Sequence, residues 1–129
     1  MARRSTKPLG DLERAVMEQL WALPTGDELT VREVHEALAN RELAYTTVMT
    51  VLDRLAKKQL VTRVRDGRAW RYQAAASREQ LTAETLRTSL APLDAGDRQT
   101  VLMHFLQDAS DADLAALRAG LAEVELRRS

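Results

Sequence analysis

The chain has 129 residues with 19 basic and 19 acidic side chains, so its formal net charge at neutral pH is zero. This length predicts one domain, or one small domain with an appendage. The absence of cysteine excludes a disulfide framework, a thiolate metal site and a redox thiol. No apolar stretch reaches the length of a membrane span, and no apolar segment follows the basic N-terminus as a secretory signal requires. A soluble, cytoplasmic protein is therefore expected.

The charges are unevenly distributed. Residues 1–75 contain 13 Lys and Arg against 10 Asp and Glu, whereas residues 76–129 contain 6 against 9. Residues 41–75 alone contain 8 basic side chains against 3 acidic ones. Such asymmetry is typical of a basic binding face on an otherwise balanced protein, although solvated faces also vary by a few charges.

The N-terminal third predicts a basic arm followed by two helices. Residues 1–8 are expected to be a disordered arm, which Pro8 closes. A first helix is predicted from about Asp11 to Ala22, because its acidic first turn suits the helix dipole. Thr30 and Glu33 form the sequence pattern of a capping box, which predicts the start of a second helix that ends near residue 40.

Residues 43–58 carry the most informative pattern, a helix with two distinct faces. Apolar residues recur at helical spacing on one face, at Val48, Val51, Leu52 and Leu55. Threonines and cations lie on the other face, at Thr47, Thr50, Arg54 and Lys57. Thr is a mediocre helix former, but its hydroxyl and methyl groups suit base edges in the major groove of DNA. The alternative is an ordinary solvated helix.

The segment that follows predicts a β-hairpin. Residues 59–65 and 68–72 have strand character, and Asp66-Gly67 between them is a strong signal for a type I′ turn. Trp70 and Tyr72 should lie on one face of the returning strand. Three helices followed by a hairpin form a winged helix-turn-helix. Its arginines could lie along DNA phosphates, or could simply solubilise an edge strand.

Together these two segments define the predicted DNA-contacting residues. They are Thr46, Thr47, Met49, Thr50, Arg54, Lys57, Arg63, Arg65, Arg68 and Arg71.

The remainder of the chain predicts three helices. A capping-box pattern begins at Ser77, Pro92 and Gly96 interrupt the sequence, and Ser110 precedes a last helix whose leucines follow an alternating spacing of three and four. Such short helices either fold back on the winged helix or pair with a second copy. The predicted organisation is a winged helix domain over residues 9–75 and a dimerisation domain over residues 76–129. The predicted dimer contacts are Leu86, Leu90, Leu102, Phe105, Leu114, Leu117, Leu121 and Val124.

Catalytic and cofactor chemistry is not indicated. His35 and His104 are the only histidines and lie in different predicted domains, so neither is expected to bind metal. No phosphate-binding loop or nucleophile motif is present. An enzyme is therefore not expected, nor is a cofactor or a metal. A winged helix that senses a small ligand directly, and one used only for protein contacts, are the competing interpretations.

Three further motifs are Leu9-Gly10-Asp11-Leu12-Glu13, Thr30-Val31-Arg32-Glu33-Val34 and Leu43-Ala44-Tyr45-Thr46-Thr47-Val48. These motifs resemble the penicillinase-repressor family of the BlaI and MecI type. The resemblance covers about residues 9–126, including the hairpin with Arg71-Tyr72. One departure is Gln59, where relatives usually carry Gly after the third helix.

The resemblance implies a homodimeric transcriptional repressor with N-terminal winged helices and a helical dimerisation region. Such repressors bind operators of the TACA…TGTA type in promoters of β-lactam resistance or related genes. It also implies release from DNA when a membrane-bound sensor-protease cuts the dimerisation region. The bond between His104 and Phe105 aligns with the family's Asn-Phe cleavage site. Copper-responsive relatives carry a C-terminal cysteine pair, so the absence of cysteine disfavours copper sensing.

Overall fold

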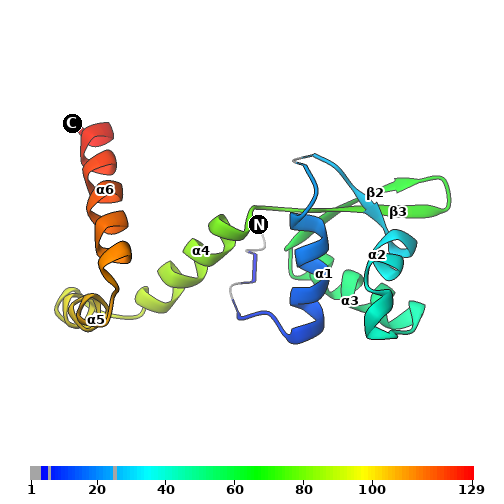
Figure 1. Cartoon of the computed structure of the whole chain (residues 1–129), viewed down its shortest axis with the longest axis horizontal. Helices are drawn as coiled ribbons and strands as arrows, with labels where there is room; N and C mark the ends of the chain where they lie inside the picture. Colours follow the sequence, from blue (N-terminus) through cyan, green and yellow to red (C-terminus); the bar gives the residue numbers. More distant parts are fainter. Residues whose placement is uncertain (1–3, 6, 25) are drawn as a thin grey trace. The chain divides into compact units, whose positions relative to one another are not determined.

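The computed structural model describes residues 4–5, 7–24 and 26–129. These residues form helices joined to a small antiparallel sheet (Figure 1). The prediction of a mostly helical fold with a winged helix is confirmed. In chain order the elements are α1 (Asp11–Trp21), β1 (Leu29–Thr30), α2 (Val31–Ala37), the 3-10 turn η1 (Ala39–Arg41), α3 (Tyr45–Lys57), β2 (Val61–Asp66), β3 (Ala69–Ala74), α4 (Arg78–Leu90), α5 (Ala95–Gln107) and α6 (Asp111–Arg128).

The chain divides into two compact units, Met1–Thr88 and Ser89–Ser129. The first contains the winged helix and most of α4. The predicted roles of a disordered arm, over residues 1–8, and of a dimerisation domain, over residues 76–129, stay predictions. Residues 1–3 and 6 of that arm lie outside the described residues.

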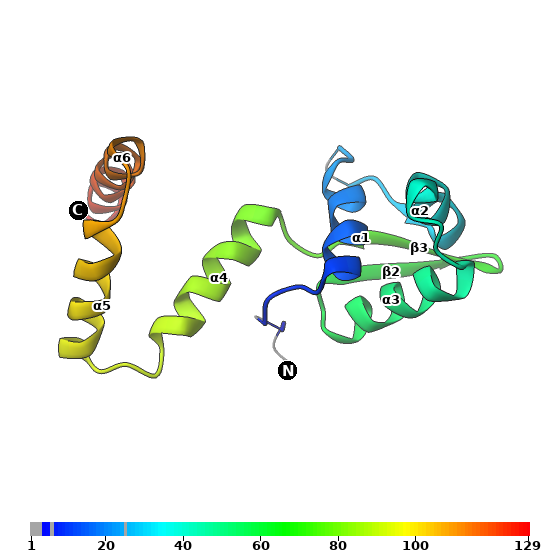
Figure 2. The same cartoon turned by 60° about the horizontal axis from the view of Figure 1, so that its bottom comes forward.

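The sheet has the strand order β1-β3-β2, with both pairings antiparallel. β1 was not predicted from the sequence, because two residues are too few to show an alternating pattern. Leu29 pairs with Tyr72 and Thr30 with Arg71, so β1 covers the edge of β3 that β2 leaves free. The β2–β3 hairpin reaches past the ends of α2 and α3 as the wing (Figures 1 and 2).

The turn of the wing differs from the predicted type I′ turn. Asp66 pairs with Ala69, so the two residues of the loop are Gly67 and Arg68 rather than Asp66 and Gly67. Only Gly67 has a positive φ, of 60°, whereas a type I′ turn needs positive φ at both positions. Glycine at the first position alone is the requirement of a type II′ turn, which also matches the twist of a hairpin. The predicted turn type was therefore wrong.

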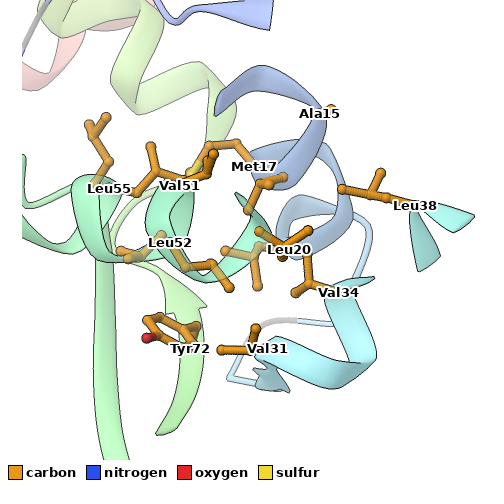
Figure 3. Packing of buried hydrophobic residues seen from close by; sticks show 14 residues of the cluster. Ala15, Met17, Leu20, Val31, Val34, Leu38, Val51, Leu52, Leu55 and Tyr72 are labelled. Carbon is orange, nitrogen blue, oxygen red and sulfur yellow. The ribbon is translucent and has the colours of Figure 1, made fainter. Parts of the chain in front are cut away.

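The core of the first unit lies between α1, α2, α3 and β3 (Figure 3). Side chains from these four elements point toward one another, and the largest fully buried ones are Tyr72, Met17, Leu52 and Leu55. The apolar face predicted for α3 is buried as expected, because Val48, Val51, Leu52 and Leu55 are all in this cluster. Burial of this face fixes which side of α3 points outward.

The capping boxes predicted at Thr30 and Ser77 are confirmed. The Thr30 hydroxyl accepts a hydrogen bond from the Glu33 N–H at 3.2 Å, and the Glu33 carboxylate accepts one from the Thr30 N–H at 2.9 Å. The same reciprocal pair joins Ser77 and Gln80. These contacts satisfy backbone donors that the first helical turn leaves free, so they set the starts of α2 and α4.

Gln59 ends α3 in a conformation that glycine usually supplies. Its φ is 63°, its N–H donates to the Ala56 carbonyl, and the N–H of Leu60 donates to the Leu55 carbonyl. These two hydrogen bonds form a Schellman motif. Gln59 therefore forms a helix end that glycine usually supplies, at the cost of placing a side chain in the left-handed region.

Replacing Gln59 by glycine is expected to stabilise the first unit by about 0.5–1 kcal/mol, because glycine adopts positive φ without strain. Urea unfolding monitored by circular dichroism measures the gain. Gln59→Ala is the control, since alanine retains the strain and should bring no comparable gain. A decrease in stability of Gln59→Gly would contradict this account.

The start of α4 packs on the winged helix. The Trp21 indole donates to the Ala76 carbonyl at 3.1 Å, and Leu81 packs against the core. Ion pairs join Arg78 to Glu18 and Arg4 to Glu84. These contacts place the first turns of α4 in the first unit.

The second unit contains α5 and α6, whose helix starts are capped by Asp94 and Ser110. Many of its large apolar side chains are exposed in the single chain: Phe105 is 54% exposed and Leu121 is 60% exposed. Among the described residues, no helix is long and apolar enough to cross a membrane.

Candidate DNA interface

The outward face of α3 presents hydroxyls, a thioether and cations. Five of the predicted contact residues of this helix are exposed: Thr46, Met49, Thr50, Arg54 and Lys57. Thr47 is only partly accessible, because it lies at the border of the buried face. The structure therefore brings together the predicted α3 residues, with Thr46 and Met49 more accessible than Thr47.

The hydroxyl of Thr50 is engaged within α3. It donates to the Thr46 carbonyl at 2.9 Å, a common arrangement for threonine inside a helix. In this rotamer the hydroxyl oxygen can still accept a hydrogen bond from an amino group on a base. The methyl group of the same side chain can pack on a thymine methyl.

Asp53 is an acidic residue on this face and was not among the predicted contact residues. Its carboxylate lies 3.1 Å from Lys57 Nζ and 3.3 Å from Arg63 Nη1. The hydrogen bond from Lys57, together with the charges of Lys57 and Arg63, holds the pKa of Asp53 below its ordinary value. The i to i+4 spacing of Asp53 and Lys57 was the available signal. Asp53 thus joins the outward face of α3 to the wing.

The wing arginines divide between different environments. The guanidinium carbon of Arg63 lies 4.6 Å from the centre of the Trp70 ring, and that of Arg65 lies 5.2 Å from it. Arg71 instead pairs with Asp66, with Nε 2.7 Å from the carboxylate oxygen. Arg68 occupies the exposed turn and has no ion-pair partner among the described residues. The four predicted arginines are therefore not equivalent.

The loop that leads into α3 is fixed by contacts the sequence did not indicate. His35 Nε2 lies 2.7 Å from the Leu43 carbonyl oxygen, and its ring meets Tyr45 edge-on at 5.7 Å. At the other end of α3, Lys58 forms a 2.7 Å ion pair with the buried Glu13. Both ends of α3 are thus tied to neighbouring helices.

The sequence matches the penicillinase repressor family over residues 9–123. It is also 53% identical over 119 residues to the transcriptional regulator BlaI of Mycobacterium tuberculosis (strain CDC 1551 / Oshkosh), covering 91% of this chain and 85% of the relative. The chain belongs to the penicillinase repressor family. Members are transcriptional repressors rather than enzymes, so the prediction of a non-enzyme is confirmed.

Comparison with solved structures supports the same fold. The solution structure of the DNA-binding domain of the repressor BlaI matches with a TM-score of 0.51 and 23% identity, covering 59% of this chain and 90% of that domain. The RosR-S4 complex structure matches with a TM-score of 0.51 and 19% identity, covering 87% of this chain and 95% of that chain. The first unit of this penicillinase repressor thus has the winged helix fold.

This repressor also has a surface groove of about 690 Å³ in its first unit. Trp21, Asp27, Gln73, Arg78 and Gln80 are among the residues that line it. The groove lies outside α5 and α6. No group of three or more potential metal-binding side chains occurs among the described residues.

Proposed function

We propose that the protein is a homodimeric repressor that binds a palindromic operator of the TACA…TGTA type and controls β-lactam-response or related genes. The observation that carries this proposal is the continuity of the α3 face with the wing, because the Asp53–Arg63 ion pair joins the two elements. An α-helix fits the major groove of DNA, and a hairpin beside it can follow the phosphates.

The two elements have different roles in this proposal. Thr46, Thr47, Met49 and Thr50 meet base edges, while Arg54 and Lys57 reach bases or phosphates. The cations of the wing neutralise phosphates and therefore contribute affinity without sequence preference. Among them Arg68 is the best placed, because it is exposed and unpaired within the described residues.

Exchanging Thr50 or Arg68 for alanine is expected to separate base reading from phosphate contact. Thr50→Ala should cost about 1–3 kcal/mol on the operator and little on a scrambled duplex. Arg68→Ala should weaken binding to both duplexes alike and lower the salt slope by about one unit per monomer. Fluorescence anisotropy titrations at several salt concentrations measure both quantities. For each variant, the loss of affinity for the operator is divided by the loss of affinity for the scrambled duplex. Equal ratios in the two variants would refute the division of roles.

The dimer in this proposal forms through the second half of the chain. Apolar residues of α6 remain exposed in the single chain, and Leu117, Leu121 and Val124 line a groove with Phe105. Exposed apolar faces of this kind are typical of helices that pair with another helix. The expected partners in this proposal are a second copy and operator DNA, and the family resemblance implies a membrane-bound sensor-protease as a third.

Release from DNA is proposed to follow proteolysis between His104 and Phe105 in α5. Both residues are exposed in the single chain, and pairing of two chains would cover the apolar side of this helix. The bond within a helix becomes accessible to a protease only when the helix opens locally. Cutting it would detach α6, weaken the dimer and empty the operator by mass action.

Mass spectrometry of the protein from induced cells is expected to detect fragments that end at His104 and begin at Phe105. Purified dimer on DNA should be cut more slowly than a monomeric variant, because pairing suppresses local opening. Fragments that end elsewhere would reject this bond. Full-length protein throughout derepression would reject proteolytic release altogether.

Direct ligand sensing is the second candidate, and the groove beside Trp21 and Arg78 favours it, because its volume lies in the range of small-molecule sites. A ligand sensor would release DNA when a small molecule is added to the uncut protein. Mobility shifts with purified full-length protein, with and without β-lactams, therefore distinguish it from proteolytic release.

A further inference from the structure

We propose that Trp70 and Asp53 are positioning residues that hold Arg63 and Arg65 ready for the DNA backbone. This inference rests on the proposed DNA contacts of the wing and assigns them a supporting structure. Neither residue needs to touch DNA in this role. Trp70 acts on both arginines through its ring, whereas Asp53 acts on Arg63 alone through its carboxylate.

The ring of Trp70 gathers the two cations. Trp70 lies opposite Arg65 in the register of the hairpin, and Arg63 lies opposite Tyr72, the next residue on the same face of β3. Both guanidinium groups are within 5.2 Å of the ring centre, inside the range of cation–π attraction. Trp70 itself is half-buried and packs against the core, so its ring is fixed. The ring thereby holds the side chains of Arg63 and Arg65 together, although the two cations repel each other.

Additional hydrogen bonds orient each guanidinium. Arg65 Nε donates to the Gly67 carbonyl at 3.1 Å, so its terminal amino groups remain for other acceptors. Arg63 Nη1 donates to Asp53 at 3.3 Å. An ordered arginine loses less side-chain entropy when it binds a phosphate, so the ordering itself favours affinity without adding a contact, whereas the negative charge of Asp53 opposes it.

This role explains why an acidic residue, Asp53, lies on a surface that is expected to meet DNA. A carboxylate there repels phosphates, and this cost falls on every DNA sequence alike. Its compensation is the link to Arg63, which fixes the wing relative to α3 while α3 lies in the major groove. Asp53 should therefore improve the discrimination of the operator at the expense of general affinity.

Variants of Trp70 in the full-length protein test the first half of this inference. Trp70→Leu removes the π face, and Trp70→Phe keeps a weaker one. On a random-sequence duplex, Trp70→Leu is expected to bind about three- to tenfold more weakly, with Trp70→Phe in between. The salt slope of Trp70→Leu should equal that of the wild-type protein, because both arginines keep their charge. Arg65→Ala, in contrast, should lower the slope by about one unit per monomer.

A double-mutant cycle separates positioning from a general effect on folding. If Trp70 acts through the arginines, Trp70→Leu should cause no further loss in a chain that already carries Arg63→Ala and Arg65→Ala. An equal loss in both backgrounds would overturn the role of Trp70. Urea unfolding of each variant identifies the fraction folded, and affinities are compared per folded protein. Failure of the wild-type protein to bind any duplex would instead reject the proposed function itself.

Asp53→Asn tests the second half. Its affinity for random duplex is expected to rise about two- to fivefold, because a negative charge is removed. The ratio of operator to random affinity should fall at the same time. Asp66→Asn is the matched control, since it removes a carboxylate that pairs with Arg71 rather than with Arg63. An unchanged ratio in Asp53→Asn, or an equal fall in Asp66→Asn, would overturn the role of Asp53.

Discussion

Replacing Leu117 and Leu121 by aspartate is expected to separate the dimer into monomers and to abolish tight operator binding. Each aspartate would place a charge in the apolar seam of α6, and burying an unpaired charge there costs several kcal/mol. Monomers must then bind the two half-sites of a palindrome independently. The advantage of a shared binding event, on the order of 10²–10⁴ in affinity, is lost.

Sedimentation velocity measures the separation, and anisotropy titration on the operator measures the loss. The matched control is Ala115→Asp with Ala122→Asp, which adds the same two charges on the opposite side of α6. This control should remain dimeric and bind DNA normally. Sedimentation of the Leu117 and Leu121 variant as an intact dimer would exclude α6 as the seam.

The helical framework could be predicted because its signals are local. The apolar spacing of α3 and the reciprocal Thr30–Glu33 cap depend on residues within three or four positions of each other, and both were confirmed. The family could be recognised from the sequence for the same reason, because the motif around Tyr45 and Thr46 is continuous along the chain.

The arrangement of the wing could not be predicted, because it depends on register. A shift of one residue exchanges the two faces of a strand, and the turn was expected at Asp66-Gly67 rather than at Gly67-Arg68. Without the register, the sequence does not show that Trp70 lies beside Arg63 and Arg65. The four arginines therefore looked alike, although Arg71 is paired with Asp66 and Arg68 is unpaired among the described residues.

Contacts between distant residues were missed for a related reason. Three pairs come together only when α3 packs on its neighbours: Asp53 with Arg63, His35 with Leu43, and Glu13 with Lys58. Glu13 was interpreted as a residue of an acidic first turn, which is correct but incomplete. Its second oxygen binds Lys58, and this long-range contact has no signature in either segment alone.

The Glu13–Lys58 pair is expected to contribute strongly to the stability of the first unit. Glu13 is 6% exposed, one of its oxygens accepts from Lys58 Nζ at 2.7 Å, and the other accepts from the Gly10 N–H at 3.1 Å. Lys58→Met would leave the buried carboxylate without its cation. Because Lys58 is partly solvated, the expected loss is about 2–3 kcal/mol at neutral pH, below the range for a fully buried pair. Lys57→Met, which breaks only the exposed pair with Asp53, should cost less than about 1 kcal/mol.

The pH dependence of this loss identifies its cause. Burial of Glu13 favours the protonated form, but the hydrogen bonds from Lys58 and Gly10 and the charges of Lys58 and Arg54 outweigh it and lower the pKa of Glu13 from its ordinary value. A lowered pKa in the folded state contributes stability that is present above the unfolded-state pKa and is lost as the pH falls through the folded-state pKa. The difference between the wild-type protein and Lys58→Met should therefore be largest near neutral pH and shrink under acid conditions. Urea unfolding from pH ~7 to pH ~3 measures it, and a difference independent of pH would attribute the loss to packing of the lysine stem instead.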